Sequence, residues 1–432
     1  MAHRPVVMLN SYSVIREAFL ERRHDFAGRF PTRTAALQNQ GSHDILFEDY
    51  NPQWKALRKV AWSAVRRYAV SESLGTLCTE TVDAFVDSLK DRTQIVDSRK
   101  PILSMLCKVI GVSIYGKSLS FSLRRLREEI GDVEQLENLN RQFYEISPNG
   151  LPSDIAPFLA FLYIKRERKM AALFCELKEI FRRLFTKAEA AYIPGNTENF
   201  THAMLTAREE AIKEDKADAQ YLTKDNMILV TMNLFNAGAD TSTGTLQWLL
   251  LRMAKEPSIQ ARIQKEIEDN IGSVPPVHGD REKLPFTVAC LLETLRMHPA
   301  APVGMPHNTT TDTRVGKWAI PKDTALMYNI YGVHHDPTNW EKPEEFRPER
   351  FLNPVTGKVR TDAGPLIAFG MGARICPGEK LAHMDMFYIL VRLMQRLSCS
   401  IPDGISDVDL NGNGSSLFSH PAQQNIVFTR RD

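Results

Sequence analysis

The sequence has no apolar run of 18 residues or more, no CxxC cysteine pair and no excess of either charge. Its six cysteines stand far apart, at positions 78, 107, 175, 290, 376 and 399. This spacing argues against a zinc or disulfide framework and fits a reducing compartment. The formal net charge of +2 argues against general nucleic-acid binding. Without a long apolar run, we expect neither a signal peptide nor a membrane anchor in this chain.

The chain also has no low-complexity stretch, no internal repeat and no linker rich in Ser, Gly or Pro. Its 432 residues would by length alone predict two or three domains. With 43% hydrophobic and 25% charged residues, the composition is that of an ordinary globular protein. Because nothing divides it, we predict a single domain over residues 1–432 with one large core.

One cysteine stands in an unusual local sequence, FGMGARICPG, at residues 369–378. Cys376 has three glycines and a proline around it, and Arg374 lies two residues before the sulfur. The next 19 residues have the apolar spacing of a helix. Backbone N–H groups at a helix N-terminus favour negative charge, so this position favours a thiolate. The glycines allow close approach of the backbone and predict a flat ligand beside the sulfur.

Two other interpretations of Cys376 stay open at this point. A single cysteine beside a helix is most often a buried core residue. It could also be a nucleophile with a nearby base such as His383, although the sequence shows no third group that would orient that base.

A second unusual stretch is the long apolar segment 224–255, which we predict to be a helix buried through the core. Its centre reads AGADTST, which is poor helix sequence. Gly238 and Gly244 each cost about 1 kcal/mol relative to alanine. Thr241 is expected to bond back to a carbonyl of its own helix. A weak centre in a buried helix indicates a site, with Asp240 and Thr241 as its polar groups.

The loop at 369–378 resembles the haem-binding loop of the cytochrome P450 family, FxxGxRxCxG. The five fixed positions are matched by Phe369, Gly372, Arg374, Cys376 and Gly378. The resemblance implies that Cys376 is the axial thiolate ligand of haem b, iron protoporphyrin IX. It also implies that the Phe369 ring packs beside the sulfur and that Arg374 pairs with a haem propionate.

Further family motifs follow in the family's order. WxxxR is matched by Trp54 and Arg58, which the resemblance implies reach a propionate. His307, in PVGMPH, stands where the family uses a basic residue against a propionate. Taken alone, the first pair would be part of an amphipathic surface helix and the histidine a structural residue. The basic residues on the other face of that helix could dock an acidic electron-transfer partner; they are Lys59, Arg66 and Arg67.

The family pattern [AG]Gx[DE]T[TS] is matched within 237–242. The resemblance implies a groove over the haem in which dioxygen binds. Thr241 would supply a hydroxyl and Asp240 a carboxylate, which together pass protons from water in a pocket poor in water.

ExxR and PERF are matched by Glu293, Arg296 and Arg350. In the family they form a buried structural network, and we do not expect them to be catalytic. A surface i,i+3 pair is the common alternative.

We predict substrate contacts at six positions, all from the resemblance: Asn140, Phe235, Ala237, Ala239, Val303 and Leu417. Asn140 aligns with an asparagine of the steroid 17α-hydroxylase branch, and an exposed helical asparagine is the alternative. Most of these side chains are apolar and several are small, which predicts a lipophilic substrate.

The resemblance implies a mainly α fold with small β sheets, and haem between the helix at 224–255 and the helix after Cys376. It implies a monooxygenase that inserts one oxygen atom of O2 into a steroid, fatty acid or xenobiotic. Electrons would come from NADPH through NADPH–cytochrome P450 reductase, with cytochrome b5 as a further candidate partner. Two alternatives are a haem isomerase or lyase acting on a peroxide, and a non-catalytic, truncated haem-binding protein.

Family members of the animal microsomal type lie on the cytosolic face of the endoplasmic reticulum membrane as monomers, and we expect the same here. Those members carry an anchor and a first helix before the point where this sequence begins.

Local patterns predict a few more elements. PVVML and the residues after it predict a strand followed by a helix capped by Ser11 or Ser13. Residues 72–220 are helical in pattern. PKD at 321–323 predicts the turn of a hairpin, and 415–428 predicts a second hairpin.

Overall fold

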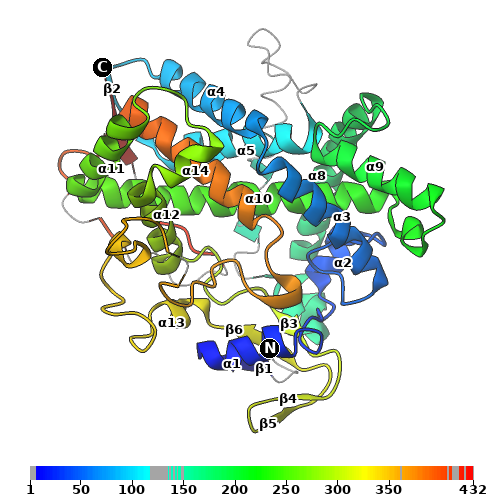
Figure 1. Cartoon of the computed structure of the whole chain (residues 1–432). Helices are drawn as coiled ribbons and strands as arrows, with labels where there is room; N and C mark the ends of the chain where they lie inside the picture. The colour runs from blue at the N-terminus through cyan, green and yellow to red at the C-terminus, as the bar shows by residue number, and fades with distance from the viewer. Residues whose placement is uncertain are drawn as a thin grey trace.

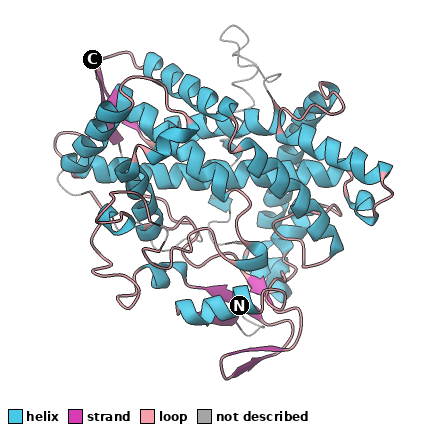
Figure 2. Ribbon diagram, in the orientation of Figure 1, coloured by secondary structure: helices cyan, strands magenta, loops and turns pink. Residues whose placement is uncertain are grey.

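The computed structural model of the chain describes residues 6–116, 135, 138–139, 142–143, 145–146, 150–360, 362–405, 408–410, 418–422 and 425–431. Helices dominate it, as predicted, and its strands form small sheets (Figures 1 and 2). One sheet lies near the C-terminus, and the others lie beside the N-terminal helix α1.

The longer helices are α3 (Pro52–Tyr68), α4 (Glu72–Ser88), α5 (Arg99–Tyr115), α8 (Ile164–Ala190), α9 (Phe200–Lys213), α10 (Lys224–Lys255), α11 (Pro257–Asn270), α12 (Pro285–Met297) and α14 (Glu379–Arg396). The shorter helical segments are α1 (Tyr12–Arg16), η1 (Glu17–Glu21), α2 (Arg33–Asn39), α7 (Pro152–Ile155), η3 (Pro157–Tyr163), η4 (Ala217–Tyr221), η5 (His278–Glu282), α13 (Ile330–His334), η6 (Pro348–Phe351) and η7 (Gly372–Arg374). The strands are β1 (Val6–Leu9), β2 (Thr93–Asp97), β3 (His307–Asn308), β4 (Thr313–Val315), β5 (Trp318–Ile320), β6 (Ala325–Tyr328), β7 (Leu397–Ser400) and β8 (Asn425–Arg430).

Helix α10 crosses the whole molecule, with α5 and α14 alongside it (Figure 1). It begins where the Thr223 hydroxyl accepts a hydrogen bond from Asn226 N at 3.3 Å, and Pro257 starts the next helix after its end. Most of its side chains are buried, because α5, α8, α12 and α14 cover different faces of it. The predicted helix at 224–255 is confirmed.

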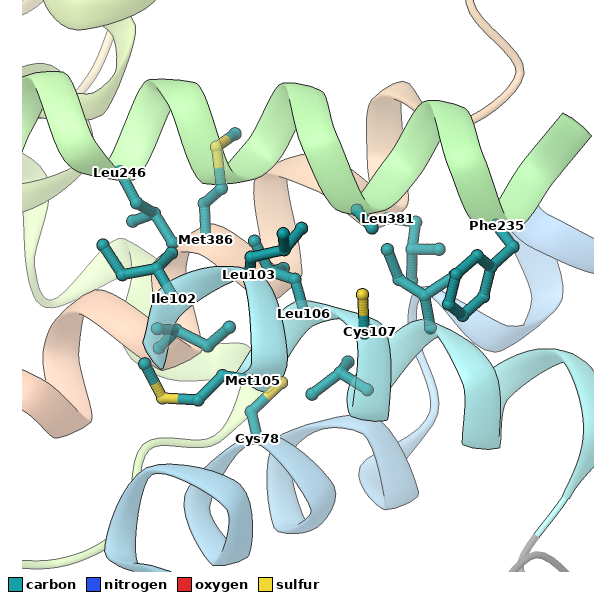
Figure 3. Packing of buried hydrophobic residues seen from close by; sticks show 14 of the residues in the cluster. Cys78, Ile102, Leu103, Met105, Leu106, Cys107, Phe235, Leu246, Leu381 and Met386 are labelled. Carbon is teal, nitrogen blue, oxygen red and sulfur yellow. The ribbon is translucent and has the colours of Figure 1, made fainter. Parts of the chain in front are cut away.

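The core between α10 and α5 is filled by branched aliphatic side chains and sulfur (Figure 3). Gly238 allows the two helices to approach, since a Cβ there would lie 2.9 Å from Cδ1 of Ile110. Gly238 therefore has a packing role, which the family pattern did not reveal. Cys78 and Cys107 are buried in this core, and burial raises the pKa of the Cys78 thiol well above its usual value.

The sheets are held by pairings between distant parts of the chain. β1 pairs in parallel with β6, Val6 opposite Ala325, and β3 joins β6 from the other side. The hairpin predicted around PKD is wrong. PKD does form a turn, at Lys322 and Asp323, but the strands on either side of it, β5 and β6, belong to different sheets. The hairpin is formed by β4 and β5, with its turn at Gly316 and Lys317, where Gly316 has the positive φ of +57° that such a turn favours.

Two more expectations differ from the structure. Strand β2 interrupts the region 72–220 that was predicted to be helical. β8 does not form a hairpin with the residues before it among those described; it pairs with β2 on one side and β7 on the other. Residues 411–417 and 423–424 lie outside the described part of the chain. Short strands of this kind depend on partners far along the sequence, so local pattern indicates them poorly.

No helix within the described ranges combines the length and the apolar character that crossing a bilayer requires.

Candidate functional site

The loop that carries Cys376 is a tight turn leading into α14. Cys376 N donates to the Phe369 carbonyl at 2.8 Å, which closes the turn around η7. Gly370 and Gly372 have φ near +76° and +72°. A side chain at Gly372 would collide with the backbone of Phe19, so the loop can lie against η1 only with glycine there.

The electrostatics of Cys376 differ from the expectation of a thiolate stabilised by the helix alone. N–H groups of Gly378 and Glu379 do point at the sulfur and favour the thiolate. Burial has the larger effect, and the pKa of the Cys376 thiol rises to about 11. The side chain is nevertheless partly accessible. Protein groups alone therefore leave the sulfur protonated at pH 7, and a bound cation would be needed to ionise it.

Three half-buried arginines lie near this sulfur: Arg29, Arg58 and Arg374. Burial lowers the pKa of Arg29 and of Arg58 to about 10. Burial, and then repulsion by the other two, lowers the pKa of Arg374 to about 8. Arg58 and Cys376 also shift each other's pKa, so they are close in space. A cluster of buried cations of this kind needs anions close by.

Protein groups satisfy this cluster only in part. Arg374 donates from Nε to Ala27 O and from Nη2 to Glu48 O, both at 2.8 Å, and lies 4.0 Å from the centre of the Trp54 ring. Its Nη1 is buried without a hydrogen-bond partner. Asp44 and Asp49 are the carboxylates that act on its pKa. Three guanidinium groups thus face two carboxylates.

Helix α3 positions Trp54 and Arg58 on one face. Asn51 caps the helix by accepting from Trp54 N at 2.8 Å, and Pro52 occupies its first turn. Trp54 Nε1 donates to Ile45 O at 3.1 Å, so the indole N–H already has a protein acceptor. Arg58 lies over the ring and donates to the Ile375 carbonyl in the cysteine loop. That either residue contacts a propionate stays a prediction.

His307, in β3, is buried and neutral. Its Nδ1 lies 2.7 Å from Phe26 O, and since a carbonyl only accepts, Nδ1 carries the proton. Burial, and then Arg29, lower the pKa of His307 well below its usual value. Both effects disfavour the cationic form of His307, which is the form that the resemblance implies.

Arg29 is a site residue that sequence reasoning missed. Its Nε donates to Leu46 O at 3.1 Å and its Nη1 to Pro306 O, and its own N–H donates to Asp49 Oδ1 at 2.8 Å. It stands in an irregular segment with no motif, and only the fold brings it to Arg374.

Accessible positions on the otherwise buried helix α10 are concentrated around Ala237 and Thr241. These two positions are four apart and lie on one face. The Thr241 hydroxyl donates to Ala237 O at 2.7 Å, the bond within the helix that the sequence predicts. This face therefore offers a hydroxyl and little side-chain bulk.

Asp240 is on a different face of α10 and is almost fully buried. Its Oδ1 accepts from Nη2 of Arg99 at 2.5 Å, and its Oδ2 lies 2.9 Å from Nε2 of His420. Sequence reasoning found neither partner, because they come from the start of α5 and from a segment near the C-terminus.

Glu293, Arg296 and Arg350 meet in one buried network. Arg296 holds both oxygens of Glu293 at 2.7 and 2.9 Å, and Arg350 Nε donates to Oε1 at 2.9 Å. Backbone carbonyls such as His334 O at 2.7 Å take the remaining N–H groups of Arg296.

The predicted substrate positions differ in how exposed they are. Phe235 is packed in the core, with its ring 5.4 Å from that of Phe181 and pointing toward α5 (Figure 3), and Ala239 is also buried. That either residue contacts a substrate stays a prediction. Ala237 and Val303 are accessible. Asn140 and Leu417 lie outside the described residues.

The residues present fit haem. In the described part of the chain, no group of three or more His, Cys, Asp or Glu side chains is arranged to hold a metal ion. The arginine cluster, with its unpartnered Nη1 of Arg374, fits the carboxylates of haem.

Comparisons with known proteins agree with this geometry. The sequence model of the family described as cytochrome P450 matches residues 1–427. A steroid 17-alpha-hydroxylase/17,20 lyase from Gallus gallus is 30% identical over 416 residues, which cover 93% of this chain and 78% of that protein. Cytochrome P450 1A1 from Limanda limanda is 29% identical over 405 residues, covering 91% and 77%. A solved structure of a zebrafish cytochrome P450 with progesterone matches with a TM-score of 0.85 at 26% identity, covering 99% of this chain and 95% of that one.

Proposed function

The chain belongs to the cytochrome P450 family and is an oxidoreductase of the monooxygenase class; from this premise we propose that it hydroxylates a lipophilic substrate of steroid size at a haem held by Cys376. The observation that carries the proposal is a half-buried cysteine in a glycine loop beside a cluster of three half-buried arginines. The comparisons support the monooxygenase prediction and neither of its alternatives.

Each group around the sulfur has a role in binding. Haem bound through a thiolate supplies the activation of dioxygen. Cys376 would be the iron ligand, and the N–H groups of Gly378 and Glu379 would hold its charge. Arg29, Arg58 and Arg374 would neutralise the propionates. Phe369, whose ring lies 5.0 Å from that of His383, would cover the sulfur and keep water away.

Thr241 and Asp240 would deliver protons to the bound dioxygen. The Thr241 hydroxyl is on the accessible face of α10, where its oxygen can accept from water; it would donate to dioxygen only by giving up its bond to Ala237 O. Asp240 would supply the carboxylate behind it, and the surrounding core limits water to what this path needs.

The substrate class rests on the accessible face of α10 and on the relatives. Ala237 offers an apolar surface without bulk, and Val303 is a second accessible apolar residue. The zebrafish structure contains progesterone, and several curated relatives are named steroid hydroxylases. A C21 steroid is therefore the first substrate to test.

The proposal also includes an electron donor and a place in the cell. Helix α3 carries Lys59, Arg66 and Arg67 exposed and has no acidic residue, so this face suits the acidic surface of an electron donor. NADPH–cytochrome P450 reductase, with cytochrome b5 as a second partner, is the proposed donor. The cytosolic face of the endoplasmic reticulum, a monomer and a single domain over residues 1–432 remain proposals.

The reduced, carbon-monoxide difference spectrum tests the proposal first. We expect the strongly red-shifted Soret band of a thiolate-ligated haem from the wild-type chain. Cys376→Ser should lose this band, whereas Cys175→Ser, at an exposed cysteine, should keep it.

Progesterone should then shift the ferric Soret band of the wild type and be hydroxylated when NADPH and the reductase are added. A wild-type chain whose carbon-monoxide band lies at the histidine-ligated position would overturn the ligand assignment. A thiolate band without any steroid-induced shift would overturn the substrate class.

A further inference from the structure

Asp240 is held by two partners that no family motif contains. Arg99 Nη2 donates to Oδ1 at 2.5 Å, and His420 Nε2 lies 2.9 Å from Oδ2. The histidine contact has the distance of an ion pair without the alignment of a hydrogen bond. The carboxylate side chain is 3% exposed, against 29% and 21% for Arg99 and His420. A nearly buried carboxylate is thus joined to two more accessible groups.

Arg99 stands at a helix position that disfavours a cation. It is the first residue of α5, and Lys100 follows it, with no acidic residue in that turn. A cation at a helix N-terminus is repelled by the helix dipole, so a carboxylate must compensate it. The Asp97 carboxylate accepts from Arg99 N at 3.2 Å, and the guanidinium reaches Asp240 instead. The pairing with α10 is what stabilises an arginine at this position.

Arg99 also determines which ring nitrogen of His420 carries a proton. Its Nη1 lies 3.3 Å from Nδ1 of His420. A guanidinium only donates, so Nδ1 is the acceptor and the proton of the neutral ring is on Nε2, toward Asp240. The two oxygens of the carboxylate therefore lie 2.5 and 2.9 Å from nitrogens that carry a proton.

Other residues on this face of α10 also contact the segments that carry Arg99 and His420. One turn after Asp240, a Cβ at Gly244 would lie 2.9 Å from Nδ1 of His420 and 3.2 Å from Ser419 O. Two turns after it, Gln247 donates to Ser98 Oγ at 3.3 Å. Positions 240, 244 and 247 share a face, so glycine in the middle leaves the space that His420 occupies.

The segment that carries His420 is itself fixed, because Ser419 N donates to Ala300 O at 2.9 Å. Asp240 is therefore held between the start of α5 and the residues before β8, while Thr241 next to it faces the accessible side of the helix.

We propose that Arg99 and His420 are positioning residues that anchor the Asp240 carboxylate, so that it supports Thr241 in proton delivery. The proposal rests on the proposed function. Without the anchor, the carboxylate is free to turn, protons reach dioxygen less well, and reduced oxygen leaves as peroxide instead of entering the substrate. The anchor supplies no electrons and breaks no bond.

The test compares charge-matched variants in the haem-loaded chain. Arg99→Gln and His420→Leu should each raise the ratio of hydrogen peroxide to steroid product severalfold, with a smaller change in the KM for steroid. Arg99→Lys and His420→Gln, which keep a donor, should restore the ratio toward the wild-type value. Lys100→Gln removes the same charge from the same helix turn at an exposed position and should leave the ratio unchanged.

Gly244→Ala provides an independent variant, because it displaces His420 without removing any charge. It should raise the peroxide ratio as His420→Leu does. A wild-type ratio in this variant and in Arg99→Gln would overturn the positioning role.

Two readouts do not depend on turnover. In the carbon-monoxide complex, the C–O stretching frequency should shift in Arg99→Gln and not in Lys100→Gln, because this frequency reports the electric field over the haem.

In urea unfolding, the effects of Arg99→Gln and Asp240→Asn on the free energy of unfolding should be non-additive. Additive effects would show that the two residues do not interact. A wild type without the thiolate band would overturn the proposed function, whereas a normal wild type with unchanged variants would overturn this inference alone.

Discussion

Arg29 illustrates how much a single charge can depend on its partner when it lies inside a protein. Burial lowers the pKa of its guanidinium to about 10, and Tyr328 and two carboxylates oppose the shift only in part. Its donors go to backbone carbonyls, which neutralise no charge. An arginine in this position is unfavourable for the chain alone and becomes favourable next to an anionic ligand.

Replacing Arg29 should weaken haem binding without destabilising the haem-free protein. We expect Arg29→Met to lose haem roughly ten- to hundredfold faster, because a charge-assisted hydrogen bond contributes about 1.5–3 kcal/mol. The haem-free form of the variant should be at least as stable as that of the wild type, because repulsion with Arg374 disappears. Absorbance during transfer of haem to an excess of acceptor protein measures the first effect, and urea unfolding the second.

Arg23→Met is the control, since that side chain is exposed six residues earlier. Equal haem loss from both variants would show that Arg29 has no special role.

Sequence alone could not reveal Arg29, Arg99 or His420. Each is a lone polar residue outside any periodic pattern, and its partner is on another element. The residues that the sequence did reveal, such as Cys376 and Thr241, lie in stretches whose local composition is unusual. Glycines crowd around the sulfur, and hydroxyls interrupt an apolar helix.

At the scale of elements, the network of Glu293, Arg296 and Arg350 joins α12 to η6 and to the segment after α13. Glu293 and Arg296 have no exposed side-chain surface, and Arg350 has 8%. Arg347 N also donates to Glu293 Oε1 at 2.9 Å. One carboxylate thus fixes two separate parts of the chain.

Glu293→Gln should destabilise the protein by about 3–5 kcal/mol, since it leaves two buried guanidinium groups without a counter-charge. The free energy of urea unfolding measures this. The matched control is Asp269→Asn, which breaks the exposed Lys265–Asp269 pair of α11 and should change stability by less than about 1 kcal/mol. A similar small effect for both would mean that Glu293 is not needed for stability.

Helices could be predicted from the sequence because the residues that determine them are close together in it, whereas short strands depend on partners far along the chain. α10 and α14 have long apolar periodicity and clear boundaries, and the sequence predicted both. β2 and β8 are short and pair with each other across more than 300 residues, so their partners are not visible locally. PKD is a turn, but the strands on either side of it join different sheets, so a local turn signal did not reveal that the hairpin closes at Gly316.

For the molecule as a whole, the buried histidines set the response to acid. Burial lowers the pKa of His298 and of His334 to about 3 and that of His383 to about 4. The unfolded chain protonates these rings near pH 6.5, but the folded chain does not. The unfolded state therefore binds more protons between pH 6.5 and about 3, and stability falls as the pH falls through this window.

His307, whose pKa burial also lowers well below its usual value, is a fourth such ring. Each ring that stays neutral contributes about 1.4 kcal/mol per pH unit, so these four should contribute roughly 5–6 kcal/mol per unit near pH 5. His298→Phe, which can keep the stack on Trp248, should lower this contribution by roughly a quarter, because His298 is one of the four rings. His278→Phe, at an exposed position, should not change it. Urea unfolding from pH 7 to pH 5 measures all three proteins, and an unchanged slope in His298→Phe would contradict the assignment.

The parallel pairing of β1 with β6 also has a consequence for synthesis on the ribosome. Val6 finds its partner only when Ala325 has emerged, about 300 residues later. At roughly 5–20 residues per second, the first strand waits about 15 to 60 seconds with its edge open. During that time its exposed N–H and C=O groups are available to any other extended segment, so a nascent chain of this protein is a natural client for a chaperone that shields strand edges.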